Sequence, residues 1–260
     1  METLIVDRRD GVVTVTMNRP QRKNAINSVM LRELVAVCEE VQYGRADRVL
    51  VLTGAGGEFC SGADLSDLGG MTGDPGTPPL LGMRRLGDAA LALHRLAKPT
   101  IAKVDGVAVG AGLSLALGCD LVVASDRSRF SAIFAQRGLS LDCGASWLLP
   151  RLVGLARAKE VALFGDLFDA ARADALGLVN RVLPAADLDR FVDDWARTLA
   201  AGPPLALSMT KTLLNDALSS SMAEAVEDEA RCQAVNFASQ DTAEAMAAFV
   251  QKRPPRFSGR

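Results

Sequence analysis

The chain has 260 residues, of which 49% are hydrophobic and 23% charged, the balance of an ordinary globular protein. Its 29 Lys and Arg against 31 Asp and Glu give a net charge of −2, which argues against a basic nucleic-acid-binding face and a polybasic membrane-binding surface. The first ten residues alternate like a strand rather than a signal peptide, and the longest uncharged stretch, 106–119, is too short to span a bilayer. We therefore expect a cytoplasmic protein that binds neither nucleic acid nor membrane.

Cysteine and histidine usage limits the possible chemistry. The cysteines are scattered, without a C-x-x-C pair: Cys38, Cys60, Cys119, Cys143 and Cys232. This pattern indicates small buried hydrophobic side chains in a reducing compartment. Because His94 is the only histidine, a metal cluster or a Ser-His-Asp triad is unfavoured. We expect no metal and no cofactor.

The N-terminal part alternates predicted strands and helices. Apolar runs at 4–6 and 12–16 flank the turn signal Asp10-Gly11 and predict a hairpin. Apolar residues at three- and four-residue steps predict a helix over 30–41. The short apolar run 49–52 is typical of a strand buried on both faces.

Small residues dominate the middle of the chain. The predicted elements there are a helix at 80–97, strands at 100–104 and 121–124, and a helix that opens at 106–112 and runs through Leu117. The first of these helices should end before Pro99, because the residue preceding a proline avoids helical geometry. The Gly- and Pro-rich stretch 66–88 is a candidate mobile flap.

Almost everything after residue 143 reads as helix. Periodic apolar segments cover 144–164, 185–201, 203–218, 221–238 and 240–251. The chain therefore divides into a strand-and-helix core, residues 1–195, and a helical region, residues 196–260. The long amphipathic faces of the second region favour packing on another subunit.

Two predicted strands run into glycine-rich turns, at 54–62 and 106–112. A dinucleotide-binding turn does not fit, because the third glycine of G-x-G-x-x-G would fall at Phe59 or Leu115. The absence of any Gly-Lys pair excludes a P-loop. One interpretation is that the turns bring main-chain N–H groups to a substrate oxyanion; the other is that they are only close-packed turns.

A series of segments in order gives a more specific signal. They are Asn18–Asn27, Gly57–Leu65, Lys98–Gly106, Gly110–Gly112, Cys119–Asp120, Leu149–Gly154, Ala175–Val179 and Ala248–Arg253. Through this combination the sequence resembles the crotonase (enoyl-CoA hydratase/isomerase) superfamily over nearly its whole length. The resemblance implies an α/β fold, a spiral of ββα units with a C-terminal helical trimerisation region. It also implies a homotrimer or a hexamer (a dimer of trimers), and a coenzyme A thioester as substrate.

The resemblance also implies site residues. The oxyanion donors would be the main-chain N–H groups of Ser61 and Ala111. The substrate-binding residues would be Arg22, Lys23, Ala25, Ile26, Ala63, Asp64, Leu65, Gly110, Phe134 and Trp147, with Phe249 and Lys252 contributed by a neighbouring subunit. Arg22 and Lys23 would either bind the coenzyme A phosphates or lie in a merely solvated loop.

Residue identities at the acid–base positions bear on the reaction. The resemblance places the two glutamates of hydratases at Ser114 and Phe134, neither of which is a carboxylate. It places the working acid of isomerase and dehalogenase branches at Asp142. A single carboxylate can move a proton between two carbons, as the shift of a double bond requires. Asp142 could alternatively be the N-cap of the helix that follows it.

The remaining polar residues favour structural roles. His94 is expected to be packed or exposed, Asp120 to make a structural hydrogen bond, and Asp64 to cap the following segment or touch substrate. Trp147 would line the acyl pocket or pack in the core. Ser114 would bond its own helix or orient a water or a polar acyl group.

Our first hypothesis is therefore a Δ3-Δ2 enoyl-CoA isomerase. The alternatives are an atypical enoyl-CoA hydratase, a non-catalytic acyl-CoA-binding homologue, and a hydrolase or dehalogenase with Asp142 as its nucleophile.

Overall fold

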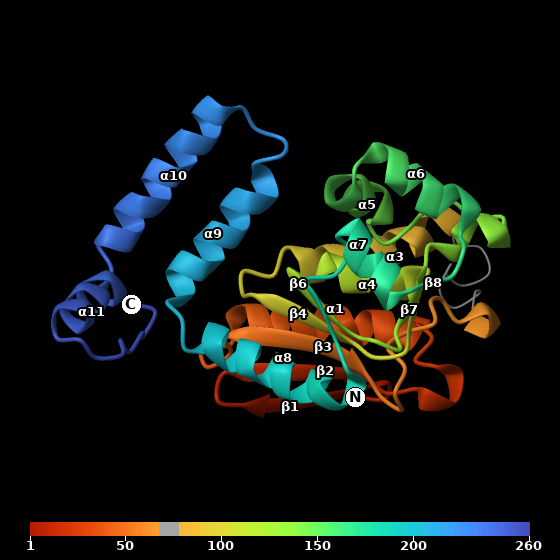
Figure 1. Cartoon of the computed structure of the whole chain (residues 1–260), viewed down its shortest axis with the longest axis horizontal. Helices are drawn as coiled ribbons and strands as arrows, with labels where there is room; N and C mark the ends of the chain where they lie inside the picture. The colour runs from red at the N-terminus through yellow and green to blue at the C-terminus, as the bar shows by residue number, and fades with distance from the viewer. Residues whose placement is uncertain (68–77) are drawn as a thin grey trace.

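A mixed six-stranded sheet lies at the centre of the computed structural model, which describes residues 1–67 and 78–260 (Figure 1). In spatial order its strands are β1 (Leu4–Arg9), β2 (Val12–Met17), β3 (Val49–Gly54), β4 (Thr100–Val104), β6 (Leu121–Ser125) and β9 (Arg181–Leu183). The first two strands are antiparallel and the other neighbours are parallel. The predicted hairpin is confirmed, and both Asp10 and Gly11 adopt positive φ at its turn.

Strand β3 illustrates why its apolar run is continuous. Val49 and Val51 pack against α8 (Ala185–Ala200) on one face of the sheet. Leu50 and Leu52 belong to the larger cluster on the opposite face. Because side chains alternate between the faces of a strand, burial on both sides requires apolar residues at every position.

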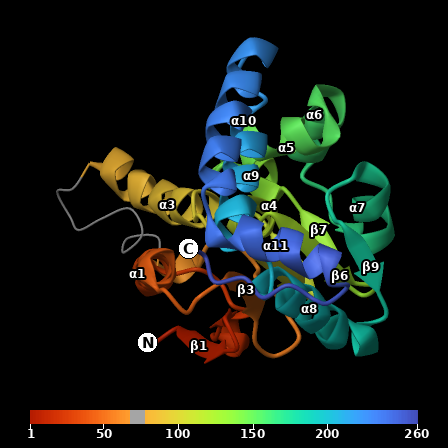
Figure 2. The ribbon, with the colours of Figure 1, turned by 90° about the vertical axis from the view of Figure 1, so that its left-hand side faces the viewer.

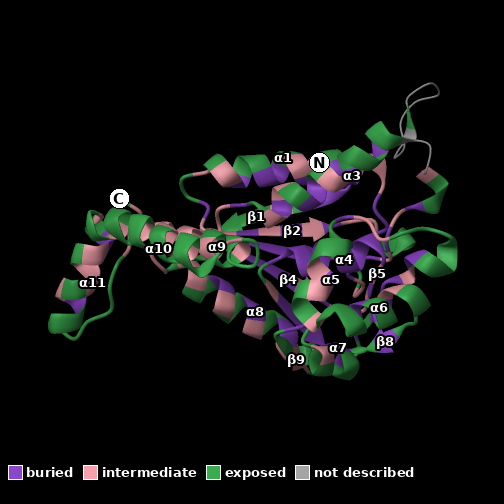
Figure 3. Ribbon diagram, turned by 90° about the horizontal axis from the view of Figure 1, so that it is seen from above, coloured by how far each residue is buried: buried purple, intermediate pink, exposed green. Residues whose placement is uncertain are grey.

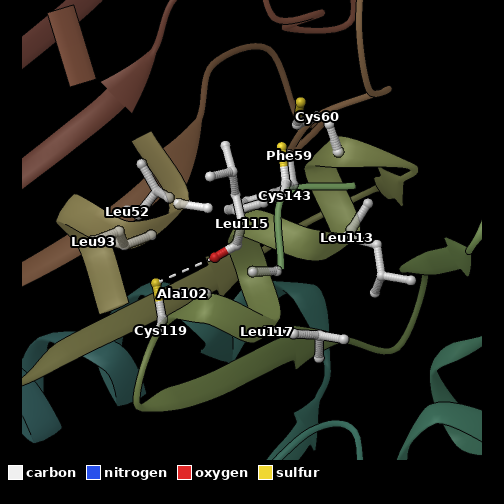
Figure 4. Close-up of a cluster of buried hydrophobic side chains, with 14 of the residues drawn as sticks. Leu52, Phe59, Cys60, Leu93, Ala102, Leu113, Leu115, Leu117, Cys119 and Cys143 are labelled. Atoms are coloured by element: carbon white, nitrogen blue, oxygen red, sulfur yellow. Dashed lines mark hydrogen bonds between the residues drawn. The ribbon is translucent and has the colours of Figure 1, made fainter. Parts of the chain in front are cut away.

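The helices that contribute to the larger cluster include α1 (Ser28–Tyr43), α3 (Pro79–His94) and α4 (Ala111–Gly118). All eight residues of α4 are buried, and Figure 4 shows its Leu113 and Leu115 among side chains from β3, β4 and α3. The helix predicted at 80–97 is confirmed but ends at His94. Helix α3 also takes in the last part of the candidate flap, whose residues 68–77 lie outside the described residues.

A second, three-stranded sheet was not predicted. Its strands are β5 (Val107–Val109), β7 (Arg129–Ser131) and β8 (Phe168–Asp169). The stretch 106–112 was expected to open a helix, but it first forms β5, and the helix begins only at Ala111. Strands of two or three residues are too short to show an alternating pattern, so this sheet could not be predicted from the pattern of apolar residues.

The helical structure after residue 143 is interrupted more often than predicted. Its elements before α8 are α5 (Ala145–Val153), α6 (Leu155–Phe164), β8, α7 (Ala170–Leu176) and β9. The single helix expected at 144–164 is wrong: it is divided at Gly154, whose φ of 77° and ψ of 159° are not helical. Strands β8 and β9 also interrupt a region that was expected to be helical.

The C-terminal helices form an arm that extends away from the large sheet (Figures 1 and 3). They are α9 (Pro204–Asp216), α10 (Met222–Phe237) and α11 (Gln240–Val250). Neither α9 nor α10 contains a buried residue. The expected division at 195/196 falls inside α8, which packs on the sheet through Ala196, so the arm begins at α9. In the described part of the chain, no helix combines the length and apolarity needed to cross a membrane.

Candidate active site

The two glycine-rich turns lie side by side. The Cys60 N–H donates to the Val107 carbonyl oxygen (2.8 Å), and the Val109 N–H donates to the Cys60 carbonyl oxygen (3.0 Å). These two bonds form a parallel bridge between Cys60 and Ala108. Segments that lie almost 50 residues apart in the sequence thus share one edge, immediately before α4 begins.

Glycine is required at this meeting point because the backbones are in close contact. A Cβ on Gly62 would lie 2.9 Å from the Val109 carbonyl oxygen and 3.8 Å from the Ala111 nitrogen, and its φ of +100° is unfavourable for other residues. A Cβ on Gly112 would lie 2.4 Å from the Cys60 carbonyl oxygen. These glycines therefore let the start of α4 pack directly on the first turn.

The amide of Ser61 is occupied, which corrects its predicted role. Its N–H donates to the Lys23 carbonyl oxygen (3.0 Å), and its hydroxyl donates to the Arg22 carbonyl oxygen (3.2 Å). Ser61 thus ties the turn to the preceding loop. An N–H that already has a good acceptor is not free to bind a thioester oxygen.

The amide of Ala63 has the orientation that was expected of Ser61. The neighbours of Ala63 both bond to Ile26: the Ile26 N–H donates to the Gly62 carbonyl oxygen (2.8 Å), and the Asp64 N–H donates to the Ile26 carbonyl oxygen (2.7 Å). In such a parallel bridge the residue between the two bonded neighbours directs its own N–H to the opposite side. We infer that this side faces the start of α4, because Cys60, three residues earlier, pairs with Ala108 of β5 immediately before that helix. Within residues 1–67 and 78–260, no acceptor lies within hydrogen-bond distance of this N–H.

Ala111 is the first residue of α4. Its N–H likewise has no acceptor among the residues described, and no side chain caps this helix. The preceding residue, Gly110, has a φ of 54° and donates its own N–H to Ser131. The first N–H groups of a helix have no partner within the helix and carry partial positive charge. The Ala111 amide is therefore a ready donor to an anionic oxygen.

Asp142 lies in the loop between the 3₁₀ helix Ile133–Arg137 and α5. It is not the N-cap of α5: that position is Gly144, and no side chain caps the helix. In the described part of the chain, the Asp142 Oδ1 atom is buried and has no hydrogen-bond partner. Burial raises the pKa of this carboxyl group from 3.8 to about 6. A carboxylate in this state can exchange a proton near neutral pH.

Ser114 connects this loop to α4. Its hydroxyl oxygen lies 3.2 Å from the Asp142 carbonyl oxygen and 3.2 Å from the Gly110 carbonyl oxygen. The hydroxyl has one proton, which the two acceptors share. Phe134 is buried beside Gly110, and its side chain has no ionisable group. Neither residue at the expected glutamate positions is therefore a carboxylate that could act as acid or base.

The loop expected to bind coenzyme A lies beside the Ser61 segment. Lys23 and Arg22 are exposed, whereas Ala25 and Ile26 are buried. The Lys23 ammonium group forms an ion pair with Glu58 (2.8 Å), so its charge is partly neutralised. No ion pair to Arg22 is formed by the residues that the structure describes.

Asp64 has a structural environment. Its carboxylate accepts hydrogen bonds from the Ser66 hydroxyl (2.6 Å) and main-chain N–H (3.0 Å), and it forms an ion pair with Arg19 (2.7 Å). Hydrogen bonding from Ser66, followed by Arg19, lowers its pKa to about 2. These contacts agree with the capping interpretation of Asp64. Leu65, by contrast, is exposed at the start of a 3₁₀ helix.

The other predicted residues lie elsewhere. His94 packs edge to face on Trp147, with 5.2 Å between ring centres. The Asp120 carboxylate accepts hydrogen bonds from the Thr100 N–H (2.7 Å) and hydroxyl (2.9 Å), as expected of a structural residue. Phe249 and Lys252 lie at the end of the arm, and Figures 1 and 3 show α11 far from α4 in the same chain. One chain therefore does not bring these two residues to the site.

The cysteines and the possible metal ligands bear on the chemistry that the site can perform. Four of the five cysteines are buried, and Cys232 is partly buried. Among residues 1–67 and 78–260, no three His, Cys, Asp or Glu side chains are grouped so as to hold a metal ion.

Comparison with known proteins identifies the family. A family profile described as enoyl-CoA hydratase/isomerase matches residues 7–260. The chain belongs to the enoyl-CoA hydratase/isomerase family. It is 38% identical over 264 residues to 1,2-epoxyphenylacetyl-CoA isomerase of Escherichia coli strain K12, an alignment that covers 100% of both chains. It is 36% identical over 258 residues to a protein of Rhodobacter capsulatus named "probable enoyl-CoA hydratase", covering 99% of this chain and 98% of that protein.

The fold agrees with this assignment. The crystal structure of an enoyl-CoA hydratase from Bacillus anthracis matches with a TM-score of 0.94 at 27% identity, covering 99% of this chain and all of that one. The crotonase-type fold implied by the sequence resemblance is therefore confirmed. The chain is an enzyme of the enoyl-CoA hydratase/isomerase family, whose relatives carry both isomerase and hydratase names.

Proposed function

We propose that this enzyme is an acyl-CoA isomerase that moves a double bond from Δ3 to Δ2. In this proposal the N–H groups of Ala63 and Ala111 hold the thioester oxygen, and Asp142 carries the proton. The observation that supports it best is the buried Asp142 oxygen without a partner, next to a helix whose corresponding position is Ser114 instead of a second carboxylate. One relative with full-length similarity is itself named as an isomerase of an acyl-CoA.

The proposed reaction begins with Asp142 as a base. With a pKa of about 6 it is mostly ionised at neutral pH. The carboxylate takes a proton from Cα, and the electron pair of that C–H bond moves toward the thioester, whose oxygen becomes negatively charged. The Ala63 and Ala111 amides stabilise this charge, and one such donor typically contributes about 3 to 4 kcal/mol. Protonated Asp142 then returns the proton to Cγ, so that the double bond lies between Cα and Cβ.

Hydration is the second candidate, because several relatives are named enoyl-CoA hydratases. Two carboxylates that share a water would be required by the mechanism that the resemblance implies. Ser114 and Phe134 stand at those positions here, and Asp142 is the only carboxylate that we assign to the site. The name of the E. coli relative suggests a 1,2-epoxyphenylacetyl thioester as a further candidate substrate.

Turnover of 3-hexenoyl-CoA by wild type and by Asp142→Asn tests the proposal. We expect wild type to convert 3-hexenoyl-CoA to 2-hexenoyl-CoA without change of mass. A gain of one water when 2-hexenoyl-CoA is supplied as substrate would indicate hydration, because only that alkene is conjugated to the thioester. Asn cannot accept the proton, so turnover should fall by about 10²- to 10⁴-fold while binding of the thioester persists. Asp174→Asn, which changes an exposed carboxylate of α7, serves as the control. Unchanged turnover in Asp142→Asn would remove that residue from the mechanism, and saturable binding with no turnover of either 3-hexenoyl-CoA or 2-hexenoyl-CoA by wild type would indicate a non-catalytic homologue.

We further propose that the arm mediates assembly into a homotrimer or a hexamer, so that residues 196–260 act as an oligomerisation region. Its exposed apolar side chains include Leu214, Leu218, Met222, Val235, Phe237, Met246 and Phe249. Phe249 is 84% exposed, and burial of such a residue against a second subunit would be favourable. Phe249 and Lys252 could then approach coenzyme A bound to a neighbouring subunit. Light scattering of the purified protein measures the assembly, and a monomer at micromolar concentration would contradict it.

A further inference from the structure

A cavity of about 630 Å³ lies between α3, α4, α5 and α9. Ser114 and Cys143 are part of its lining, and they flank the point at which α4 contacts the Asp142 main chain. In Figure 2, which looks from the side of the arm, α9 lies in front of α4, and both helices contribute residues to the lining of the cavity. The cavity thus begins next to the proposed proton carrier.

The direction of the cavity follows from the helix that forms one wall. Ser114, Leu115 and Gly118 line it, and these residues lie three, four and seven positions after Ala111. Such spacing places all four residues on one face of a helix. If the thioester oxygen is held at the Ala111 amide, an acyl group that runs along this face of α4 reaches the cavity at Ser114.

Small residues of α3 and α4 leave these parts of the cavity wall without protruding side chains. Gly87 and Ala90 of α3 lie across from Gly118 of α4. A Cβ on Gly87 would meet nothing within 4 Å, and one on Gly118 would come no closer than 3.9 Å to Leu93. A broad, planar group can therefore lie between the two helices.

Trp147 supplies an aromatic surface in the same cavity. Its side chain is 38% exposed, it packs edge to face on His94, and the Arg151 guanidinium lies 3.9 Å from its ring centre. These contacts hold the indole in one orientation. Aromatic rings associate preferentially with other rings, beyond the effect of buried area alone.

One part of the cavity lining is polar. It comes from α9 and includes Thr212, Asn215 and Asp216. A straight chain that extended along α9 would bury methylene groups against these side chains without satisfying them. A compact ring fills the space near Trp147 and leaves the polar wall to water or to a polar substituent.

We infer that this cavity receives the distal part of the acyl group, and that Trp147 selects acyl groups that carry a planar ring over straight chains of equal carbon number. The inference rests on the proposed function, since it takes the thioester to be held at the Ala63 and Ala111 amides. It names Trp147 as a specificity-determining residue and a ring-bearing acyl-CoA as the substrate class.

Fluorescence titration provides the test. The chain has two tryptophans, so Trp195→Phe leaves Trp147 as the only indole; Trp195 lies on α8 beside Phe191, in the cluster on the other face of the sheet. Phenylacetyl-CoA and octanoyl-CoA both carry eight acyl carbons and lack an isomerisable alkene. We expect phenylacetyl-CoA to change the Trp147 emission and to bind about three- to tenfold more tightly than octanoyl-CoA.

Substitution of Trp147 distinguishes an effect of its aromatic ring from an effect of its side-chain volume. Affinities of these variants are measured by isothermal titration calorimetry, which needs no indole. Trp147→Leu should abolish the preference for phenylacetyl-CoA, whereas Trp147→Phe should keep most of it, and Trp195→Leu should leave it unchanged. Equal affinity of wild type for the two thioesters, or equal weakening of both by Trp147→Leu, would overturn the inference. The Trp147→Phe variant keeps the test decisive if the leucine variant does not fold.

The two proposals can fail separately. Turnover of 3-hexenoyl-CoA that depends on Asp142, without any ring preference, would leave the isomerase proposal intact and overturn this one. A ring preference without turnover would support the cavity assignment and overturn the isomerase proposal. No saturable binding of either thioester would overturn both.

Discussion

The Ser114 hydroxyl oxygen lies 3.2 Å from the carbonyl oxygen of Asp142, and this contact joins the helix that begins with the Ala111 amide to the loop that carries the carboxylate. The oxyanion donor and the proton carrier are therefore positioned relative to each other by one buried hydroxyl group. Two successive left-handed residues, Cys143 and Gly144, follow Asp142 and turn the chain into α5. Strained backbone of this kind persists where surrounding contacts hold it in place.

Substitution of Ser114 by Ala should loosen this connection. Loss of one buried hydrogen bond should destabilise the protein by about 1 kcal/mol, measured by urea unfolding. Because the carboxylate would be held less precisely, kcat for 3-hexenoyl-CoA should fall about tenfold while KM changes little. A proportional rise in KM with unchanged kcat would show that Ser114 contributes to binding and not to the position of Asp142.

Substitution of Gly62 by Ala should disrupt the paired amides. The new Cβ would lie 2.9 Å from the Val109 carbonyl oxygen, so the Ala63 segment must move away from α4. We expect turnover to fall by about 10²-fold, the effect of losing one oxyanion donor. Gly177→Ala is the matched control: its φ of +79° imposes similar strain, but its nearest contact would be 3.9 Å away. If both variants lose activity equally, backbone strain and not displacement of Ala63 is responsible.

The rate of isomerisation should depend on pH through Asp142. Its pKa is raised to about 6 by burial, and the proposed reaction requires the ionised form. kcat/KM should therefore fall by tenfold per pH unit below about pH 6 and be constant above it. A profile that is flat through this region, or one that falls as pH rises, would contradict the role of Asp142 as the initial base.

The same shift should appear in the stability of the protein. Because the folded-state pKa is raised from 3.8 to about 6, the folded protein retains a proton that the unfolded chain releases between these pH values. Wild-type stability should therefore decrease as pH rises through this window, whereas Asp142→Asn lacks this decrease. Allowing for partial solvent screening, the variant should gain about 1 to 2 kcal/mol relative to wild type between about pH 4 and pH 7. A difference between the two proteins that is independent of pH would show that burial of Asp142 has little energetic effect.

The fold was more predictable than the geometry of the site. Continuous apolar runs such as 49–52 identified strands buried on both faces, because packing on both sides leaves no position for a polar residue. Strands β5, β7 and β8 were missed because elements of two or three residues carry no periodicity. Gly154 divided a predicted helix through its backbone conformation, which the apolar pattern around it does not reveal.

The geometry of the site could likewise be predicted from the sequence only in part. The sequence indicated which two turns would meet, since each follows a buried strand and is rich in glycine. It did not indicate whether Ser61 or Ala63 directs its N–H toward α4, because that choice depends on pairing with Lys23 and Ile26, residues about 40 positions away. Asp142 could be singled out because it is a lone carboxylate near the acid position implied by the family. That its Oδ1 atom is buried without a hydrogen-bond partner among the described residues became visible only in three dimensions.

A crystal structure with bound phenylacetyl-CoA tests the central claim most directly. The account predicts that the thioester oxygen accepts hydrogen bonds from the Ala63 and Ala111 N–H groups, each at about 2.7 to 3.2 Å. It also predicts that a carboxylate oxygen of Asp142 approaches the Cα atom. A thioester oxygen bound by another group, or an Asp142 side chain that remains out of reach of the acyl group, would contradict it.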